Sequence, residues 1–297
     1  MAASQQLDKV IEMMKARSAG RSLTVEDDRV SYERFTYDFP LVEGTRCERV
    51  GVGSVTAEWV TAPGADENRV MLYFHGGGYL FGSTRTHRAT LSRISQASGG
   101  RVLGLDYRLA PEFAFPAPVE DAVAVYRWLL SNGADPAKIT LGGDSAGGGL
   151  TVSTLVALRY LGEPLPAAGI CVSAWADLEH TGEAMTTNAE VDPSVNRERL
   201  SRMAKIFLGG KDPRTPLASP IHADLHGLPP LIMMVGSIEV LLDDSVRLSE
   251  RARSAGVDAT LEVWDDMPHN WHMYAHLLPE GQQAVERIGE FAREHTG

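Results

Sequence analysis

The segment around Ser145 carries a residue pattern that could do chemistry. Gly143 and Gly147 flank this serine two positions away on either side, in the sequence Gly-Asp-Ser-Ala-Gly. A short apolar stretch at 138–142 precedes the pattern, and apolar residues at helical spacing follow it at 146–161. A serine on a strained turn between strand and helix is lifted out of the sheet, and the small flanking residues let strand and helix approach closely. Ser145 is therefore a candidate nucleophile.

Two other interpretations of this glycine-rich turn remain open. Ser145 could cap the following helix, because a serine oxygen can accept a hydrogen bond from a backbone N–H group of the first turn. The turn could also bind a phosphate group at the helix N-terminus. A Walker-type loop is excluded because no Gly-Lys-Ser/Thr sequence follows. The strand before the turn and the helix after it favour the nucleophile.

A second glycine cluster, His75-Gly76-Gly77-Gly78, directly follows a predicted strand that ends at Phe74. Glycines let the backbone come close to a ligand. Their N–H groups can face an oxyanion, where one donor contributes roughly 2.7–4 kcal/mol of transition-state stabilisation. Taken alone, the cluster could equally be a flexible turn with an incidental histidine. Two such motifs in this order, each at a strand end, indicate a nucleophile with an oxyanion site more specifically than either motif alone.

Together with three further stretches, these motifs resemble the hormone-sensitive-lipase family of esterases, also called bacterial family IV, which has the α/β-hydrolase fold. The matching stretches are His-Gly-Gly-Gly at 75–78, Asp-Tyr-Arg-Leu-Ala-Pro-Glu at 106–112, Phe-Pro-Ala at 115–117, Gly-Asp-Ser-Ala-Gly-Gly at 143–148 and Met-Pro-His at 267–269. The resemblance runs from about residue 45 to the C-terminus. It implies a serine carboxylic-ester hydrolase acting on short-to-medium acyl esters. It also implies that the backbone N–H groups of Gly77, Gly78 and Ala146 form the oxyanion hole.

The general base is chosen among nine histidines by chain order. In an α/β-hydrolase the nucleophile comes first, an acidic residue second and the base last, which argues against His75 and His87. The predicted base is His269, because it lies in the loop after the last expected strand and also matches the family motif. His272 and His276 remain alternatives, although both are typical of packing or surface histidines.

The predicted acid, Glu239, is implied by the resemblance. The family usually has Asp-Pro-Leu-x-Asp after the buried strand that is expected here at 230–235. Aligned on the downstream Leu and Asp, Glu239 takes the position of the catalytic Asp, and Val240 replaces the Pro. A glutamate is one methylene longer and must fold back to reach the imidazole, but it serves this role in other α/β-hydrolases.

Three aspartates remain alternatives to Glu239 as the acid. Asp243 and Asp244 are expected to open the following helix, where a carboxylate suits the N-terminal dipole. Asp177 satisfies the chain order but follows an earlier strand than the family position. The predicted catalytic triad is thus Ser145, Glu239 and His269.

Several nearby residues are assigned structural roles. Asp106 and Arg108 are expected to pair and fix the loop after a central strand, and Asp144 is expected to bind local backbone. Four aromatic side chains could line an acyl pocket or simply pack in the core: Tyr79, Phe81, Trp175 and Phe207.

The elements that must position these residues alternate along the chain. Strands are expected at 49–60 (as one or two strands), 69–74, 101–106, 138–142, 168–173, 230–235 and 259–264. Helices are expected at 86–98, 118–132, 146–161, 241–255 and 280–295. This alternation predicts an α/β fold with a mostly parallel central sheet flanked by helices on both faces.

Two regions fall outside this alternation and predict a helical cap. Apolar residues at helical spacing indicate three further helices, at 4–19, 24–38 and 194–208. We expect residues 1–44 to form the N-terminal part of the cap, and 45–297 to form the catalytic α/β-hydrolase domain. A cap insertion is expected at about 178–218, where no strand is indicated.

Composition narrows the classes of partner. The chain has 297 residues, a net charge of −11 and no run of basic residues, so nucleic-acid binding is not expected. Its two cysteines cannot form a Cys-rich metal site and no His-Glu-x-x-His motif occurs, so neither a metal nor a cofactor is expected. The most apolar stretch, 228–242, is too short and too interrupted to span a bilayer. With no visible signal peptide, we expect a cytoplasmic protein without stable membrane insertion.

The expected partner is a small-molecule ester, and the resemblance allows a homodimer because family members often pair through an edge strand. Two rival functions stay open. The first is an amidase or peptidase, since the same triad cleaves amides. The second is a non-catalytic ligand-binding module, since hydrolase-fold hormone receptors resemble the family but lack part of the triad.

Overall fold

The computed structural model describes residues 5–19 and 24–297, and its centre is one eight-stranded sheet in the order β1-β2-β4-β3-β5-β6-β7-β8. The strands are β1 (Arg46–Val52), β2 (Val55–Thr61), β3 (Asp66–Phe74), β4 (Gly100–Asp106), β5 (Ile139–Asp144), β6 (Ala168–Val172), β7 (Leu231–Gly236) and β8 (Ala259–Trp264). β2 runs antiparallel to both β1 and β4, and the remaining neighbours are parallel. The predicted mostly parallel sheet is confirmed.

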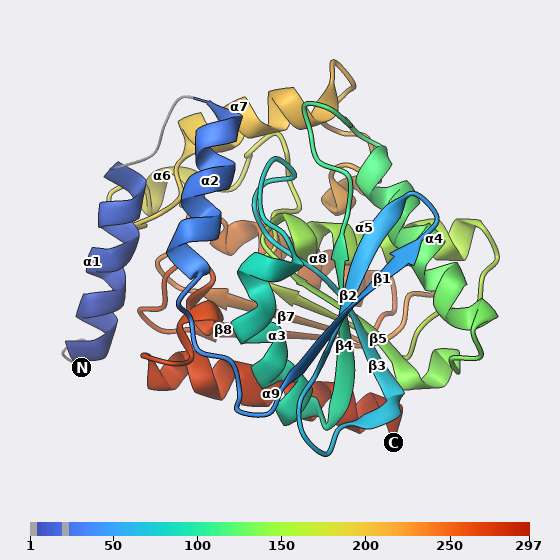
Figure 1. The fold of residues 1–297 in the computed structure, drawn as a ribbon. Coiled ribbons are helices and arrows are strands. Elements are labelled where there is room, and N and C mark those ends of the chain that lie inside the picture. Colours follow the sequence, from blue (N-terminus) through green and yellow to red (C-terminus); the bar gives the residue numbers. More distant parts are fainter. Residues whose placement is uncertain (1–4, 20–23) are drawn as a thin grey trace.

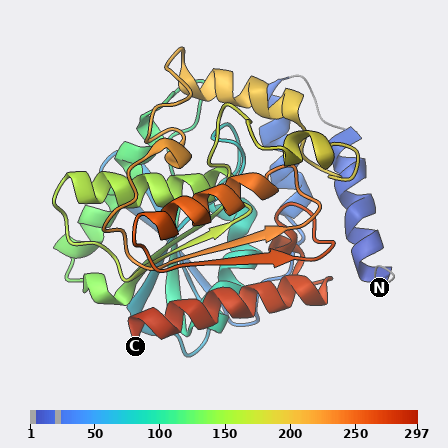
Figure 2. The same ribbon diagram turned by 180° about the vertical axis from the view of Figure 1, so that it is seen from behind.

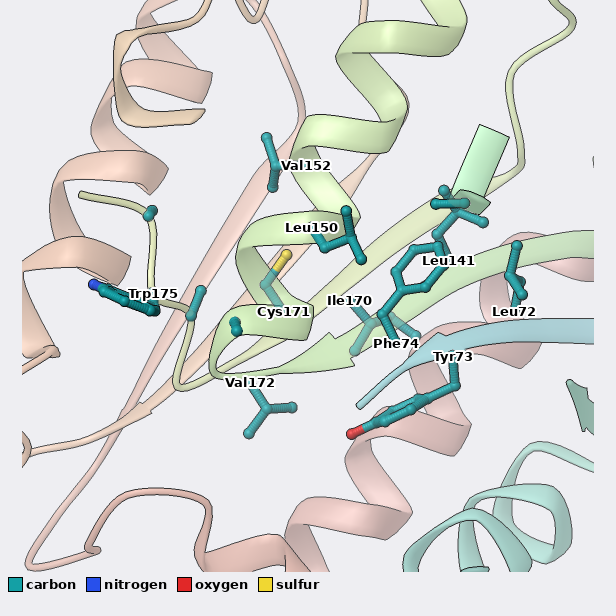
Figure 3. Packing of buried hydrophobic residues seen from close by; sticks show 14 of the residues in the cluster. Leu72, Tyr73, Phe74, Leu141, Leu150, Val152, Ile170, Cys171, Val172 and Trp175 are labelled. Carbon is teal, nitrogen blue, oxygen red and sulfur yellow. The ribbon is translucent and has the colours of Figure 1, made fainter. Parts of the chain in front are cut away.

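The region expected to hold one or two strands at 49–60 forms the antiparallel hairpin β1–β2. Its turn contains Gly53 with φ of 59°, a left-handed conformation that glycine adopts without steric cost. In the middle of the sheet, Leu72 of β3 and Leu141 of β5 are register partners in the buried core (Figure 3). The last five residues of β3 and all of β5 are buried because helices cover both faces of the sheet here.

Five long helices cover the sheet: α3 (Thr84–Ser98), α4 (Ala117–Ser131), α5 (Ala146–Tyr160), α8 (Leu242–Ser254) and α9 (Pro279–Thr296). α3 and α9 pack together on one face, and α4, α5 and α8 lie on the other (Figures 1 and 2). α3 begins with a capping box in which Ser83 and Thr86 bind each other's backbone N–H groups, which starts the helix two residues before the predicted 86.

Four further helices, here called the outer helices, are α1 (Gln5–Ala19), α2 (Val25–Thr36), α6 (Ala184–Thr187) and α7 (Arg197–Leu208). They lie together at one side of the molecule, where the arrowheads of β7 and β8 point (Figure 2). Residue 4, the predicted start of the first helix, lies outside the described residues. The sequence did not indicate the single-turn helix α6.

Contacts between distant parts of the chain join the outer helices to one another. The Ser18 hydroxyl at the end of α1 donates to the carbonyl of Pro193, just before α7. Arg199 of α7 pairs with Asp28 of α2 at 3.1 Å. No helix in the described ranges is long and apolar enough to cross a membrane. The cytoplasmic location stays a prediction.

Candidate active site

Ser145 occupies the turn between β5 and α5 with φ of 54° and ψ of −119°, a backbone conformation that non-glycine residues rarely adopt. A Cβ atom at Gly143 would overlap the backbone of Gly147, and one at Gly147 would overlap the carbonyl of Phe74. Only glycines therefore allow strand and helix to meet this closely. The Ser145 side chain makes no capping hydrogen bond, so the helix-cap interpretation is wrong.

Ser145, His269 and Glu239 are joined by two hydrogen bonds. His269 Nε2 lies 3.0 Å from Ser145 Oγ, and His269 Nδ1 lies 2.7 Å from Glu239 Oε2. Because an ionised carboxylate only accepts, Nδ1 donates to Glu239 and Nε2 is left to accept the serine proton. Each residue lies in the loop or turn after a parallel strand: Ser145 after β5, Glu239 after β7 and His269 after β8. The carboxyl ends of parallel strands meet at one edge of the sheet, which brings the three together.

The added length of Glu239 is accommodated by a fold-back onto its own strand end. Its Oε1 atom accepts from the backbone N–H of Gly236 at 2.6 Å and from the hydroxyl of Ser173 at 2.7 Å. The same hydroxyl accepts from the backbone N–H of Asn270, next to His269, at 3.1 Å. Ser173 follows β6 and was not singled out from the sequence, where its place at a strand end was the only available signal.

The three rival aspartates are bound elsewhere. Asp243 accepts from the backbone N–H of Ala184, and Asp244 accepts from those of Ala176 and Asp177. Asp177 pairs with Arg247 at 3.0 Å. Burial, only partly offset by those two N–H groups, raises the pKa of Asp244 to about 8. None of the three carboxylates is within hydrogen-bond distance of His269 in the described part of the chain.

The two alternative histidines are also held apart from the nucleophile. His272 lies in a short 3-10 helix, η3 (Trp271–Tyr274), and its Nε2 is 3.3 Å from the hydroxyl of Tyr73. Burial lowers the pKa of His272 to about 4, so the ring is neutral near pH 7. The ring of His276 contacts Phe39 with centroids 4.4 Å apart.

The electrostatic surroundings of His269 favour its protonated form. Burial alone lowers the pKa of the imidazole, but the hydrogen bond to Glu239 and the negative charges of Glu239, Asp192 and Asp144 outweigh it. The pKa of His269 therefore lies above its ordinary value of 6.5. A base that is stabilised on gaining a proton is suited to accept one from a hydroxyl.

The second glycine cluster forms a tight loop beside Ser145. Gly77 and Gly78 have φ of 122° and 60°, and both line the same cavity as Ser145 and His269. A Cβ atom at Gly77 would overlap the carbonyl of Phe81, and one at Gly78 would overlap the Met203 side chain. Ala146, the first residue of α5, is fully buried next to the serine.

The cavity above Ser145 is mainly apolar and draws its walls from the outer helices α1, α2 and α7. Phe81 and Trp175 line it, as expected of two of the four predicted aromatic residues. The other two, Tyr79 and Phe207, stack on each other in the core with centroids 3.8 Å apart. Further lining residues are Met14, Arg17, Tyr32, Phe35, Arg199 and Met203.

Two structural assignments made from the sequence are wrong. Asp106 accepts from the backbone N–H of Thr84 at the start of α3, whereas Arg108 pairs with Asp121 at 2.8 Å, so the expected Asp106–Arg108 pair does not form. Asp144 does not bind local backbone either. It accepts instead from the hydroxyl of Tyr73, the backbone N–H of Gly76 and the side-chain amide of Asn270, which all lie on segments distant in the chain.

One cluster has the composition of a metal site but is already neutralised by the protein. Ligand atoms of Asp177, Glu179 and His222 lie within 4.8 Å of one another. Arginines take up both carboxylates, since Arg247 pairs with Asp177 and Arg214 pairs with Glu179 at 2.8 Å.

Comparison with known proteins agrees with this geometry. A family model described as α/β hydrolase fold matches residues 71–273. An acetyl-hydrolase of Streptomyces hygroscopicus is 47% identical over 99% of this chain and 98% of its own. An esterase of Acinetobacter venetianus is 33% identical over 86% of this chain and 84% of its own.

Solved structures point the same way. The crystal structure of an esterase from the bacterial hormone-sensitive lipase family superposes with a TM-score of 0.98 at 61% identity, covering 100% of both chains. An esterase/lipase from an uncultured bacterium gives a TM-score of 0.94 at 45% identity over 99% of each chain. The chain therefore belongs to the hormone-sensitive-lipase family of α/β hydrolases and is a serine carboxylesterase, an enzyme rather than a binding module.

Proposed function

We propose that this esterase cleaves short-to-medium acyl esters through a Ser145–Glu239–His269 triad and an acyl-enzyme. The observation that carries the proposal is the continuous hydrogen-bonded chain from Ser145 Oγ through the imidazole of His269 to Glu239. No other carboxylate in the described ranges is hydrogen-bonded to that ring. We assign the oxyanion hole to the backbone N–H groups of Gly77, Gly78 and Ala146.

In the proposed mechanism, His269 Nε2 removes the proton of Ser145 as the oxygen attacks the ester carbonyl. Glu239 keeps the proton on Nδ1 and stabilises the imidazolium that forms. Negative charge on the carbonyl oxygen is stabilised by the N–H groups of Gly77, Gly78 and Ala146. The imidazolium then protonates the departing alcohol. Water, deprotonated by the same ring, attacks the acyl-serine and restores the enzyme.

The position of the outer helices supports the proposal that the substrates are short-to-medium acyl esters. We propose that residues 1–44 and the insertion at about 178–218 act as a cap over the catalytic domain, 45–297. α1, α2 and α7 supply cavity walls directly above Ser145. Met203 of α7 lies against Gly78, so the cap restricts the space beside the proposed oxyanion hole. An apolar cavity narrowed in this way suits a short acyl chain better than a long one.

The test of the proposal is hydrolysis of 4-nitrophenyl esters from acetate to palmitate by the wild type and by Ser145→Ala. We expect activity on short chains in the wild type and a loss of roughly 10⁶-fold in kcat in the variant. Circular dichroism controls for folding. Hydrolysis of the matching 4-nitroanilides measures any amidase activity. A folded Ser145→Ala protein that keeps its esterase activity would refute the triad.

We also propose that the chain pairs through the exposed edge of β8. Among the described residues, β8 is the last strand of the sheet and has β7 as its one neighbouring strand, so no strand covers its outer edge. Val263 on this strand is 44% exposed. Light scattering after gel filtration would give twice the chain mass of 32.2 kDa for a dimer. A monomer at micromolar concentration would contradict the pairing.

A further inference from the structure

The acidic residue beside the nucleophile, Asp144, is fully buried and touches neither Ser145 Oγ nor His269. The proposed mechanism gives it no role, yet a buried charge is costly unless several donors satisfy it. Its partners therefore indicate why the fold keeps a carboxylate at this position.

The Asp144 carboxylate joins the two loops that flank Ser145. Oδ1 accepts from the backbone N–H of Gly76 at 3.1 Å, in the glycine loop assigned to the oxyanion. Oδ2 accepts from the side-chain amide of Asn270 at 2.6 Å, one residue after the base. A Cβ atom at Gly76 would overlap this carboxylate, so the glycine loop and Asp144 are in van der Waals contact as well.

Further groups hold the carboxylate itself in place. The Tyr73 hydroxyl of β3 donates to Oδ1 at 3.0 Å, and His87 Nε2 of α3 lies 3.3 Å from the same atom. Burial alone would raise the pKa of Asp144, but the imidazole of His87 and the hydrogen bond from Tyr73 outweigh it and keep the pKa below its ordinary value. The carboxylate of Asp144 is thus ionised near neutral pH.

We propose that Asp144 is a positioning residue that fixes the oxyanion loop through Gly76 and the base loop through Asn270 relative to Ser145. The inference rests on the proposed roles of the triad and of the glycine loop. The nucleophile turn already follows Asp144 in the chain, so one side chain sets the relative placement of all three catalytic segments. No substrate contact is required for this role.

The amide of Asn270 is suited to this link. Asn270 has φ of 58°, a left-handed conformation that asparagine tolerates better than most residues. Its backbone N–H binds Ser173, which in turn binds Glu239. The base loop is therefore anchored on one side to the acid, through Ser173, and on the other side to Asp144.

The first test is Asp144→Asn, which keeps the shape of the side chain but removes its charge. It also replaces one accepting oxygen by an NH2 group, which cannot accept a hydrogen bond. We expect kcat on 4-nitrophenyl butyrate to fall about 100-fold, the loss typical of a misplacement of about 1 Å. KM should change little, because the substrate cavity is untouched.

A pH profile separates positioning from general damage. The negative charge of Asp144 is one of the contributions that raise the pKa of His269. The other titratable groups near Asp144 and His269 are Tyr73, His75, His87, Tyr107, Asp192, Glu239 and His272. Removal of the Asp144 charge should move the acidic limb of kcat/KM to lower pH. An enzyme that is merely destabilised would lose kcat/KM at every pH, and the pH of its acidic limb would be unchanged.

The second variant, Asn270→Gly, removes one donor to the Asp144 carboxylate but keeps its charge and its other partners, and it serves if Asp144→Asn does not fold. Glycine accepts the left-handed backbone at this position, so only the amide is lost. We expect kcat to fall on the order of tenfold, as for the loss of one hydrogen bond to a charged group. The double variant should be no slower than Asp144→Asn alone, because both changes break the same connection.

Asp121→Asn is the matched control. Asp121 is 3% exposed and binds Arg108, away from the triad, so its loss should lower the melting temperature and leave kcat and the pH limb unchanged. Wild-type kcat in folded Asp144→Asn, or in Asn270→Gly if the first variant is unfolded, would overturn the inference alone. A wild type inactive on every ester would instead remove the proposed function on which it rests.

Discussion

The loops at the carboxyl ends of the strands and the outer helices are held in place by different interactions. In the loops, the fully buried carboxylates Asp144 and Glu239 accept hydrogen bonds from segments far apart in the chain. The outer helices are joined to their surroundings by apolar packing and by partly exposed ion pairs, such as Arg29–Glu112. Breaking a buried bond to a charge costs more than breaking an exposed ion pair. The loops should therefore govern rate, and the outer helices substrate fit.

The largest effect expected from this comparison is at Glu239. Glu239→Ala should lower kcat about 10⁴-fold, because the imidazole loses both its fixed tautomer and its counter-charge. Steady-state kinetics with 4-nitrophenyl butyrate measure it. Asp243→Ala is the control, since Asp243 binds the backbone of Ala184 and not His269. Equal activity in the two variants would show that the acid lies elsewhere.

A second effect follows from the raised pKa of His269. The neutral ring is the active base, so kcat/KM should fall as pH decreases through that pKa, by about tenfold for each further pH unit. Because the pKa is raised, the midpoint should lie above 6.5. A pH–rate profile of the wild type from pH 5 to 9 locates it. A midpoint below 6.5 would mean that burial outweighs the neighbouring carboxylates.

The outer helices should change specificity more than rate. Met203→Ala on α7 removes a side chain beside Gly78, and we expect a relative gain of about tenfold for longer acyl chains, in line with a methylene or two of added space. Ratios of kcat/KM for hexanoate and acetate esters measure it. Leu208→Ala is the control, because Leu208 is buried on the same helix but does not line the cavity. An unchanged ratio in Met203→Ala would show that α7 does not limit chain length.

The smallest effect is expected at Glu112, whose side chain is 52% exposed. Glu112→Gln should cost roughly 0–1 kcal/mol of unfolding free energy. The hydrogen bond from Arg29 lowers the pKa of Glu112 to about 2. The stabilisation is therefore present above the ordinary pKa of 4.5 and is lost as pH falls towards 2. Melting curves at pH 7 and pH 3 test this, and a larger difference at pH 3 would contradict it.

Much of the fold could be predicted because its signals are local. Strand runs, helical spacing and glycine clusters each lie within a few residues, and together they indicated the parallel sheet and the turn at Ser145. His269 could be chosen because it fits the chain order, lies in the loop after the last expected strand and matches the family motif.

The remaining features depend on register and side-chain direction, which a sequence does not display. Ser173 contacts Glu239 only because β6 lies between β5 and β7. Asp144 was expected to bind local backbone, yet its partners come from β3, α3 and the loop after β8. Asp106 was paired with Arg108 through closeness in the chain, but the two side chains have different partners. The single turn of α6 is too short to show a periodicity.

The walls of the cavity come from opposite ends of the chain. Met14 and Phe35 lie in the first helices, whereas Met273 and Tyr274 lie near the C-terminus. A ribosome makes α1 and α2 before it makes η3, so their side chains cannot contact Met273 and Tyr274 until η3 has also left the ribosome. The substrate cavity is therefore completed only after translation has passed η3.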